Sequence, residues 1–145
     1  MTTAQHYRGL KSAFNAAKIN EFYGTDLEVT EGTSTLTLAM DDRFFHSLGA
    51  AHGSVYFKML DDAAFFACMS LETEFVILTN SFTTYLTRPI SEGSMTAVGK
   101  VLNQNKTQFI AESVVYDDQQ REIGRGNGIF ARTKTTLDQL VGYNT

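Results

Sequence analysis

The chain has 145 residues, of which 43% are hydrophobic, enough to bury the core of one ordinary globular domain. It carries 16 acidic and 12 basic residues, for a net charge of −4, and no dense basic run marks a nucleic-acid surface. No apolar stretch has the length of a membrane span, residues 1–9 are polar and hold no signal-peptide core, and one cysteine, Cys68, allows no internal disulfide. We therefore expect a single cytoplasmic domain over residues 1–145 that binds neither nucleic acid nor membranes. The three histidines and Cys68 lack metal-ligand spacing, so no metal site is expected.

The first 24 residues predict an amphipathic helical segment that packs on the rest of the domain. Apolar residues recur there at helical spacing, namely Tyr7, Leu10, Phe14 and Ala17. Gly24 is placed to end the segment. Residues 33–40 then alternate between apolar and small polar side chains, which predicts a half-buried strand, and residues 44–51 are expected to form a loop.

Residues 54–71 predict a central helix that is enclosed by protein, because apolar residues lie on nearly all of its sides. Two carboxylates, Asp61 and Asp62, interrupt this apolar run. Desolvating a carboxylate costs several kcal/mol, so such a residue is expected to pair, cap or do chemistry. Adjacent helix positions point about 100° apart, so we expect only one of the two acids in a pocket and Asp62 on a solvated or interface surface.

Four strand-like runs follow, at residues 75–86, 94–102, 107–116 and 122–133, and residues 134–145 form a tail. The breaks between the strands are short and rich in turn residues, which suits antiparallel hairpins. One buried helix against a long antiparallel sheet predicts an α+β domain whose sheet curls around that helix, with an extra helix at the N-terminus.

Several motifs resemble those of the hot-dog-fold acyl-CoA thioesterases, within the 4-hydroxybenzoyl-CoA thioesterase superfamily. His52-Gly53 precedes the central helix, and Asp61 lies nine residues after that histidine. The segment Tyr-Leu-Thr-Arg-Pro at 85–89 is followed by Gly93, and an acidic turn joins the last two strands. Over residues 44–133 the order and spacing are most similar to the phenylacetate-degradation-type thioesterase group. The resemblance implies a hot-dog fold, with a long central helix wrapped by a curved antiparallel sheet.

The resemblance also implies a mechanism for thioester hydrolysis. The Gly53 N–H, at the positive end of the central helix, would stabilise the oxyanion that forms on the thioester carbonyl. Asp61, which reaches the site from a neighbouring subunit in this family, would act as a general base or as a nucleophile. Thr79, ten residues before Pro89, matches a hydroxyl residue that helps to hold the water or the acid. Such a hydrolase needs no metal or bound cofactor.

Two positions depart from the family pattern. His46 stands where the family usually has Asn, and Ser54 replaces the usual second Gly after the histidine. Ser54 suits a helix start, whereas His46 can also act as an acid or base near neutral pH. His46 and Asp61 are fifteen residues apart, close to the spacing of hot-dog 3-hydroxyacyl-thioester dehydratases, which is an alternative function. A non-catalytic domain that binds acyl-CoA or another small apolar ligand is a further alternative.

Partners follow from the same resemblance. The expected substrate is an acyl-CoA, and the expected assembly is a homodimer or a homotetramer built from two dimers, with the active site at a subunit interface. Pairing edge strands across a two-fold axis would also remove their unpaired backbone groups. His52 is expected to hold the helix start, and with Ser54 it would border the substrate. Cations available for CoA phosphates are Arg88 and Lys106, followed by Arg125, Arg132 and Lys134.

Overall fold

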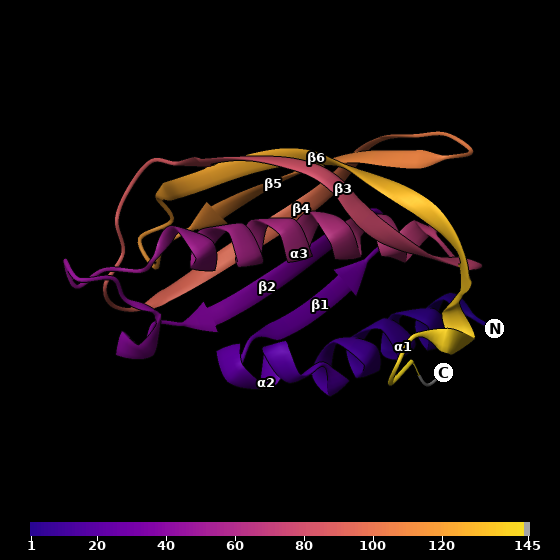
Figure 1. The fold of residues 1–145 in the computed structure, drawn as a ribbon, viewed down its shortest axis with the longest axis horizontal. Helices are drawn as coiled ribbons and strands as arrows, with labels where there is room; N and C mark the ends of the chain where they lie inside the picture. Colours follow the sequence, from indigo (N-terminus) through magenta and orange to yellow (C-terminus); the bar gives the residue numbers. More distant parts are fainter. Residues whose placement is uncertain (144–145) are drawn as a thin grey trace.

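The computed structural model describes residues 1–143, and two short helices come first (Figure 1). Helix α1 (Thr3–Ala16) begins with a capping box between Thr2 and Gln5, and α2 (Lys18–Tyr23) follows. The single predicted helix is broken at Ala17, whose extended backbone (φ −73°, ψ 128°) ends one helix and starts the next. Gly24 ends α2 in the left-handed conformation, as predicted. Residues 144–145 of the predicted tail lie outside the described residues.

All the described strands form one antiparallel sheet. In chain order they are β1 (Asp26–Thr30), β2 (Thr33–Ala39), β3 (Phe75–Leu86), β4 (Ser94–Gln104), β5 (Gln108–Tyr116) and β6 (Glu122–Thr136), and their order in the sheet is β1-β2-β4-β5-β6-β3. Strand β1 was not predicted, because five residues with two apolar side chains are too short for a clear period. Strand β6 continues to Thr136, beyond its predicted end at residue 133.

Helix α3 (Gly53–Leu71) is the central helix, and the sheet curves around it (Figure 1). It packs against strands β1 to β6, and most of its side chains are buried. The α+β hot-dog arrangement predicted from the sequence is thus confirmed. Among residues 1–143, no helix is both long enough and apolar enough to cross a membrane.

The middle of α3 lies unusually close to the sheet. A Cβ atom on Gly99 of β4 would come within 2.0 Å of the Ala63 carbonyl oxygen, so only glycine allows this approach. Ser34 of β2 donates a hydrogen bond to the same carbonyl at 2.5 Å, and Ser113 of β5 donates one to the Leu60 carbonyl at 2.7 Å. These contacts fix the depth of the helix on either side of Asp61.

The two edges of the sheet differ. Helix α1 packs against β1, and Lys11 of α1 forms an ion pair with Glu28 of β1 at 2.6 Å. Strand β3, at the other edge, is largely exposed, and Leu78, Tyr85 and Leu86 are at least half exposed on it. An exposed edge of 12 residues with apolar side chains is an unusual feature that proteins normally cover or pair.

Candidate active site

Asp61 lies in the middle of α3 and faces the outer strand β3. Its Oδ1 atom accepts a hydrogen bond from the Thr79 hydroxyl at 2.9 Å, so the structure brings these two predicted residues together. The β3–β6 register shifts between Thr79 and Ser81, which places a β-bulge directly after Thr79. Bulges change the direction of neighbouring side chains, and this one accompanies the approach of Thr79 to the helix.

The environment of Asp61 makes it a weaker acid than usual. Burial raises its pKa from 3.8 to about 6, and the neighbouring Asp62 adds to the rise. The hydrogen bond from Thr79 and the charge of Lys58 act in the opposite direction. A carboxylate with a pKa near 6 is ionised at neutral pH and is a stronger base than an exposed aspartate, which suits general-base catalysis.

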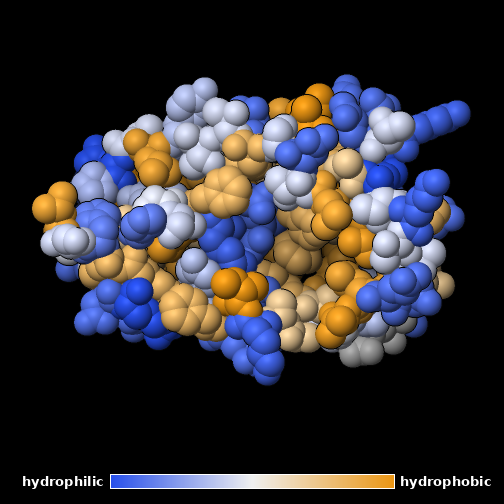
Figure 2. Space-filling model, in the orientation of Figure 1, coloured by the Kyte–Doolittle hydropathy of each residue, from blue (hydrophilic) through white to orange (hydrophobic). Residues whose placement is uncertain are grey.

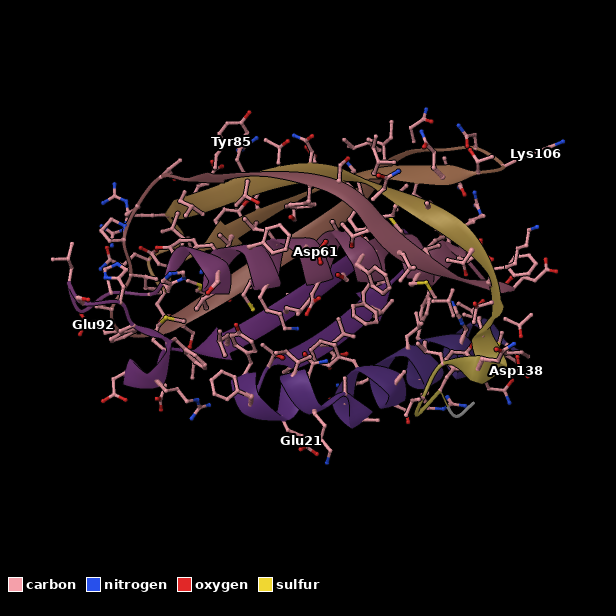
Figure 3. All side chains as sticks on the ribbon, in the orientation of Figure 1. Glu21, Asp61, Tyr85, Glu92, Lys106 and Asp138 are labelled. Atoms are coloured by element: carbon pink, nitrogen blue, oxygen red, sulfur yellow. The ribbon has the colours of Figure 1, made fainter. Side chains whose placement is uncertain are left out.

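Asp61 borders an apolar cavity of about 500 Å³ between α3, β3 and the N-terminal helices. Figure 2 shows the hollow near the centre of this face, with apolar side chains around most of its rim. Figure 3 places Asp61 on α3 in the same part of the molecule. The principal apolar residues that line the cavity are Phe14, Ile19, Phe65, Phe66, Met69 and Leu78. Such a cavity can bury an apolar ligand beside a reactive carboxylate.

Asp62 lines the same cavity, so the expectation that it would face solvent or an interface away from the pocket is wrong. Its side chain is 18% exposed and contacts the ammonium group of Lys58. Lys58 also donates a hydrogen bond to Asn20 of α2 at 2.6 Å. The cavity extends around α3 toward the N-terminal helices, so two positions about 100° apart on the helix both border it. Sequence reasoning missed Lys58 and Asn20; only the i, i+4 spacing of Lys58 and Asp62 signalled the ion pair.

The start of α3 presents an unpaired backbone donor. His52 is the N-cap, and its Nδ1 atom accepts from the Ser54 N–H at 3.0 Å. The Val55 N–H is bound by the His52 carbonyl at 2.9 Å. Among residues 1–143, the Gly53 N–H has no hydrogen-bond partner, and it points from the positive end of the helix. His52 therefore holds the helix start, as predicted, and leaves the Gly53 N–H available to a ligand.

His46 lies beside Gly53 in a second groove of about 400 Å³, together with Tyr56, Leu86 and Arg88. The Nδ1 atom of His46 accepts a hydrogen bond from the Leu48 N–H at 3.1 Å. In the neutral imidazole this assigns the proton to Nε2, so the ring is a donor on its free side. His46 can therefore replace the amide donor of the usual asparagine. The same tautomer is unsuited to acting as a base through Nε2.

The predicted site residues thus form two groups within one chain. Asp61 and Thr79 border the apolar cavity, whereas His46, Gly53 and Arg88 border the second groove. Gly53 and Asp61 are eight residues apart on one helix, which corresponds to about 12 Å along its axis. One chain therefore does not bring the Gly53 N–H and the Asp61 carboxylate, the predicted oxyanion donor and base, to one reacting atom.

Other predicted cations lie elsewhere. Lys106 is in the β4–β5 turn at the far end of the sheet, and the structure does not bring it to either group in one chain (Figure 3). Arg132 is a structural residue, because its side chain is 19% exposed and bonds Glu72 at 2.6 Å. Arg125 is paired with Glu122. Within residues 1–143 there is no group of three or more His, Cys, Asp or Glu that could bind a metal ion.

Comparison with known proteins identifies the family. Residues 48–123, just over half of the chain, match the model of the thioesterase superfamily, so the chain belongs to this family. The predicted family is confirmed. No curated protein sequence matches the chain significantly.

Solved structures show the same fold. The PaaI protein of the Escherichia coli phenylacetic acid degradation operon is similar with a TM-score of 0.85 at 19% identity, over 94% of this chain and 99% of that chain. A thioesterase of Haemophilus influenzae has a TM-score of 0.78 at 15% identity, over 88% and 90% of the two chains. A conserved protein of Pseudomonas aeruginosa has a TM-score of 0.76 at 22% identity, over 81% and 94%. At these identities, the similarity shows the fold.

Proposed function

We propose that this protein is an acyl-CoA thioesterase that uses Asp61 as its general base or nucleophile. The observation that carries the proposal is the placement of Asp61: a carboxylate with a pKa near 6, held by Thr79, borders an apolar cavity. The acyl group would occupy the cavity, with its thioester carbon at Asp61. Membership of the thioesterase superfamily supports the reaction class.

The reaction requires a base and an oxyanion donor at one carbonyl. Asp61 would take a proton from a water molecule while the water oxygen bonds to the thioester carbon. The Gly53 N–H would hold the oxyanion, and the His46 Nε2–H would be a second donor beside it. The carbon–sulfur bond then breaks, and CoA leaves as a thiol with the proton from Asp61. Direct attack by the Asp61 carboxylate would instead break the carbon–sulfur bond, expel CoA as a thiolate and leave an acyl anhydride. Water would hydrolyse the anhydride to the acid and free Asp61, and the proton released would go to the thiolate.

We further propose that each active site contains Gly53 of one subunit and Asp61 of another. The separation of about 12 Å along α3 supports this arrangement, because one chain cannot use both groups on one carbonyl. The exposed edge of β3 and the half-exposed Phe57 of α3 provide an apolar surface for such a homodimer. Arg88, which is exposed beside Gly53, would contact a CoA phosphate. A tetramer of two dimers and a cytoplasmic location stay predictions.

The dehydratase alternative is less well supported. It requires His46 to act together with Asp61, and the two line different grooves of the chain. The Leu48 N–H also occupies the Nδ1 lone pair of His46, which leaves a donor on its free side. A non-catalytic binding protein would use the same cavity, and the thiol-release assay below separates it from a thioesterase.

The test is release of CoA thiol from short, medium, long and aromatic acyl-CoAs. We expect hydrolysis of at least one, with kcat/KM falling below pH about 6 because Asp61 must be ionised to act. Asp61→Asn keeps the shape of the side chain and should lower turnover at least about a hundredfold. Glu28→Gln, an acid-to-amide change on β1, is the matched control and should be fully active. Equal activity of Asp61→Asn and the native protein would refute the role of Asp61.

A further inference from the structure

Lys58 is a buried cation within reach of two carboxylates. On α3 it lies three residues before Asp61 and four before Asp62, and both spacings place side chains on neighbouring parts of a helix surface. Its side chain is only 14% exposed, yet its ammonium contacts Asp62 and not Asp61. Lys58 has no direct role in the proposed reaction, although it could pair with either acid.

Contacts with the N-terminal helices hold Lys58 toward Asp62 and away from Asp61. Lys58 Nζ donates to Asn20 Oδ1 at 2.6 Å, and Asn20 Nδ2 donates to the Phe14 carbonyl at 2.7 Å. The rings of Phe14 and Tyr23 each lie 5.5 Å from the ammonium, within the range of cation–π attraction. Asn20 is itself 9% exposed. The ammonium is therefore held toward α1 and α2, on the Asp62 side of the helix.

Asp61, in contrast, has no cationic partner among residues 1–143 and is bound only through the hydroxyl of Thr79. The charged groups that act on it are Asp62 and Lys58 of its own helix. Strand β3 contributes the uncharged Thr79, α2 contributes the amide of Asn20, and the phenol of Tyr23 lies near Asp62. Burial is the main cause of the raised pKa of Asp61, and the acid that Lys58 contacts sets the charge beside it.

We propose that Asp62 is a positioning residue that occupies Lys58 and thereby keeps Asp61 unpaired for the reaction. This inference rests on the proposed thioesterase function, since it assigns Asp62 a part in preparing that carboxylate. If Lys58 bonded Asp61 instead, the acid would be a weaker base and would be drawn from Thr79. The Lys58–Asn20 bond also makes the N-terminal helices part of the active-site structure.

Substitutions on the two sides of the ion pair should have opposite effects. Asp62→Asn removes a like charge and frees Lys58 to pair with Asp61, so the pKa of Asp61 should fall by about one unit or more. The pH below which kcat/KM falls should decrease by the same amount as the pKa of Asp61. At pH 7.5 the activity should be roughly tenfold lower, because the base is weaker. Lys58→Met leaves two carboxylates without a cation, so their shared titration should move to higher pH.

The double variant Lys58→Met/Asp62→Asn removes both the competing cation and the second acid. The pH below which its kcat/KM falls should return to within about half a pH unit of the native value, and most of the activity should be regained. This rescue also protects the test against misfolding, because the double variant adds no unpaired buried charge to the one that Asp61 already carries in the native protein. Glu28→Gln is the matched control for the loss of one ion-paired acid, and it should change neither profile nor activity.

Two measurements should be made on each variant: the pH profile of kcat/KM, and the Asp61 carboxyl titration by ¹³C NMR, assigned with Asp61→Asn. Opposite shifts in Asp62→Asn and Lys58→Met, with return in the double variant, support the proposal. Unchanged or parallel shifts, with activity falling only as thermal stability falls, overturn it. If the native protein hydrolyses no acyl-CoA, the proposed function fails, while the NMR titration still decides whether Lys58 and Asp62 control Asp61.

Discussion

At the scale of single residues, the role proposed for Gly53 rests on its backbone N–H and not on its lack of a side chain. Gly53 is the first residue of α3, and the residue before it, His52, has φ −62° and ψ 147°. This is the extended conformation that a residue before proline adopts, and the first helical position tolerates proline well. Proline at position 53 is therefore compatible with the backbone; it removes the N–H group and adds a ring beside the flexible end of Leu86.

We predict that Gly53→Pro lowers kcat by about a hundred- to a thousandfold, the usual effect of losing one oxyanion donor. Thermal stability should change little. Gly53→Ala keeps the N–H, and its Cβ would lie 3.0 Å from Cδ1 of Leu86, at the flexible end of that side chain. The alanine variant should stay within about tenfold of native activity. Steady-state kinetics on both variants check this; equal activities would place the oxyanion donor elsewhere.

At the scale of secondary-structure elements, the position of Asp61 depends on how α3 lies on the sheet. Asp61 lies between Leu60 and Ala63 on the helix. The Leu60 carbonyl accepts a hydrogen bond from a serine hydroxyl of β5, and the Ala63 carbonyl accepts one from a serine hydroxyl of β2. Gly99 allows the approach to Ala63. A change that lifts the helix would therefore move Asp61 away from Thr79 as well as loosen the core.

Gly99→Ala tests this link. The added methyl group would overlap the Ala63 carbonyl, and overpacking of this kind costs about 3 kcal/mol in the free energy of unfolding. We expect a lower urea midpoint with an unchanged slope, and reduced activity in the protein that remains folded. Lys100→Ala, at the next and exposed residue of β4, is the control and should be nearly neutral. A native-like urea midpoint for Gly99→Ala would show that α3 can shift without loss.

The periodicity of apolar residues predicted most of these elements. The apolar pattern, together with the turn-rich breaks between runs, located α3 and five of the six strands, including β3, which is largely exposed in the structure. It missed β1, whose Leu27 and Val29 are too few to show a period, and the break at Ala17, which has no proline or glycine to signal it. Local pattern has little power where an element is short.

The candidate site shows a similar limit. Motif spacing predicted Asp61, Gly53 and Thr79, and the structure joins two of them by a hydrogen bond. The role of Lys58 was not predictable, because it depends on Asn20, 38 residues away in the chain. The same tertiary contact explains why Asp62 faces the cavity. Helical geometry predicts the direction in which a side chain points. The elements that pack against that side of the helix depend on the tertiary structure, which a local pattern does not predict.

At the scale of the whole molecule, two separate features point to the same assembly. The long exposed edge of β3 leaves backbone groups unpaired by another strand, and a second copy related by a two-fold axis would pair them. The proposed oxyanion donor and carboxylate of one chain lie too far apart to act together. The same two-fold axis would bring the donor of one subunit and the carboxylate of the other into each of two sites. Assembly and catalysis would then be inseparable.

Mixed dimers of two inactive variants test this arrangement. Gly53→Pro and Asp61→Asn subunits, carrying different tags, should each be inactive alone. In a mixed dimer one site would combine the intact Gly53 of one subunit with the intact Asp61 of the other, while the second site would carry both defects. Random mixing of equal amounts should therefore restore about a quarter of native activity, because half of the dimers are mixed and each has one working site. The tag-purified mixed dimer should reach about half of native activity. If every site lay within one chain, each would still carry a defect, and mixing would restore nothing.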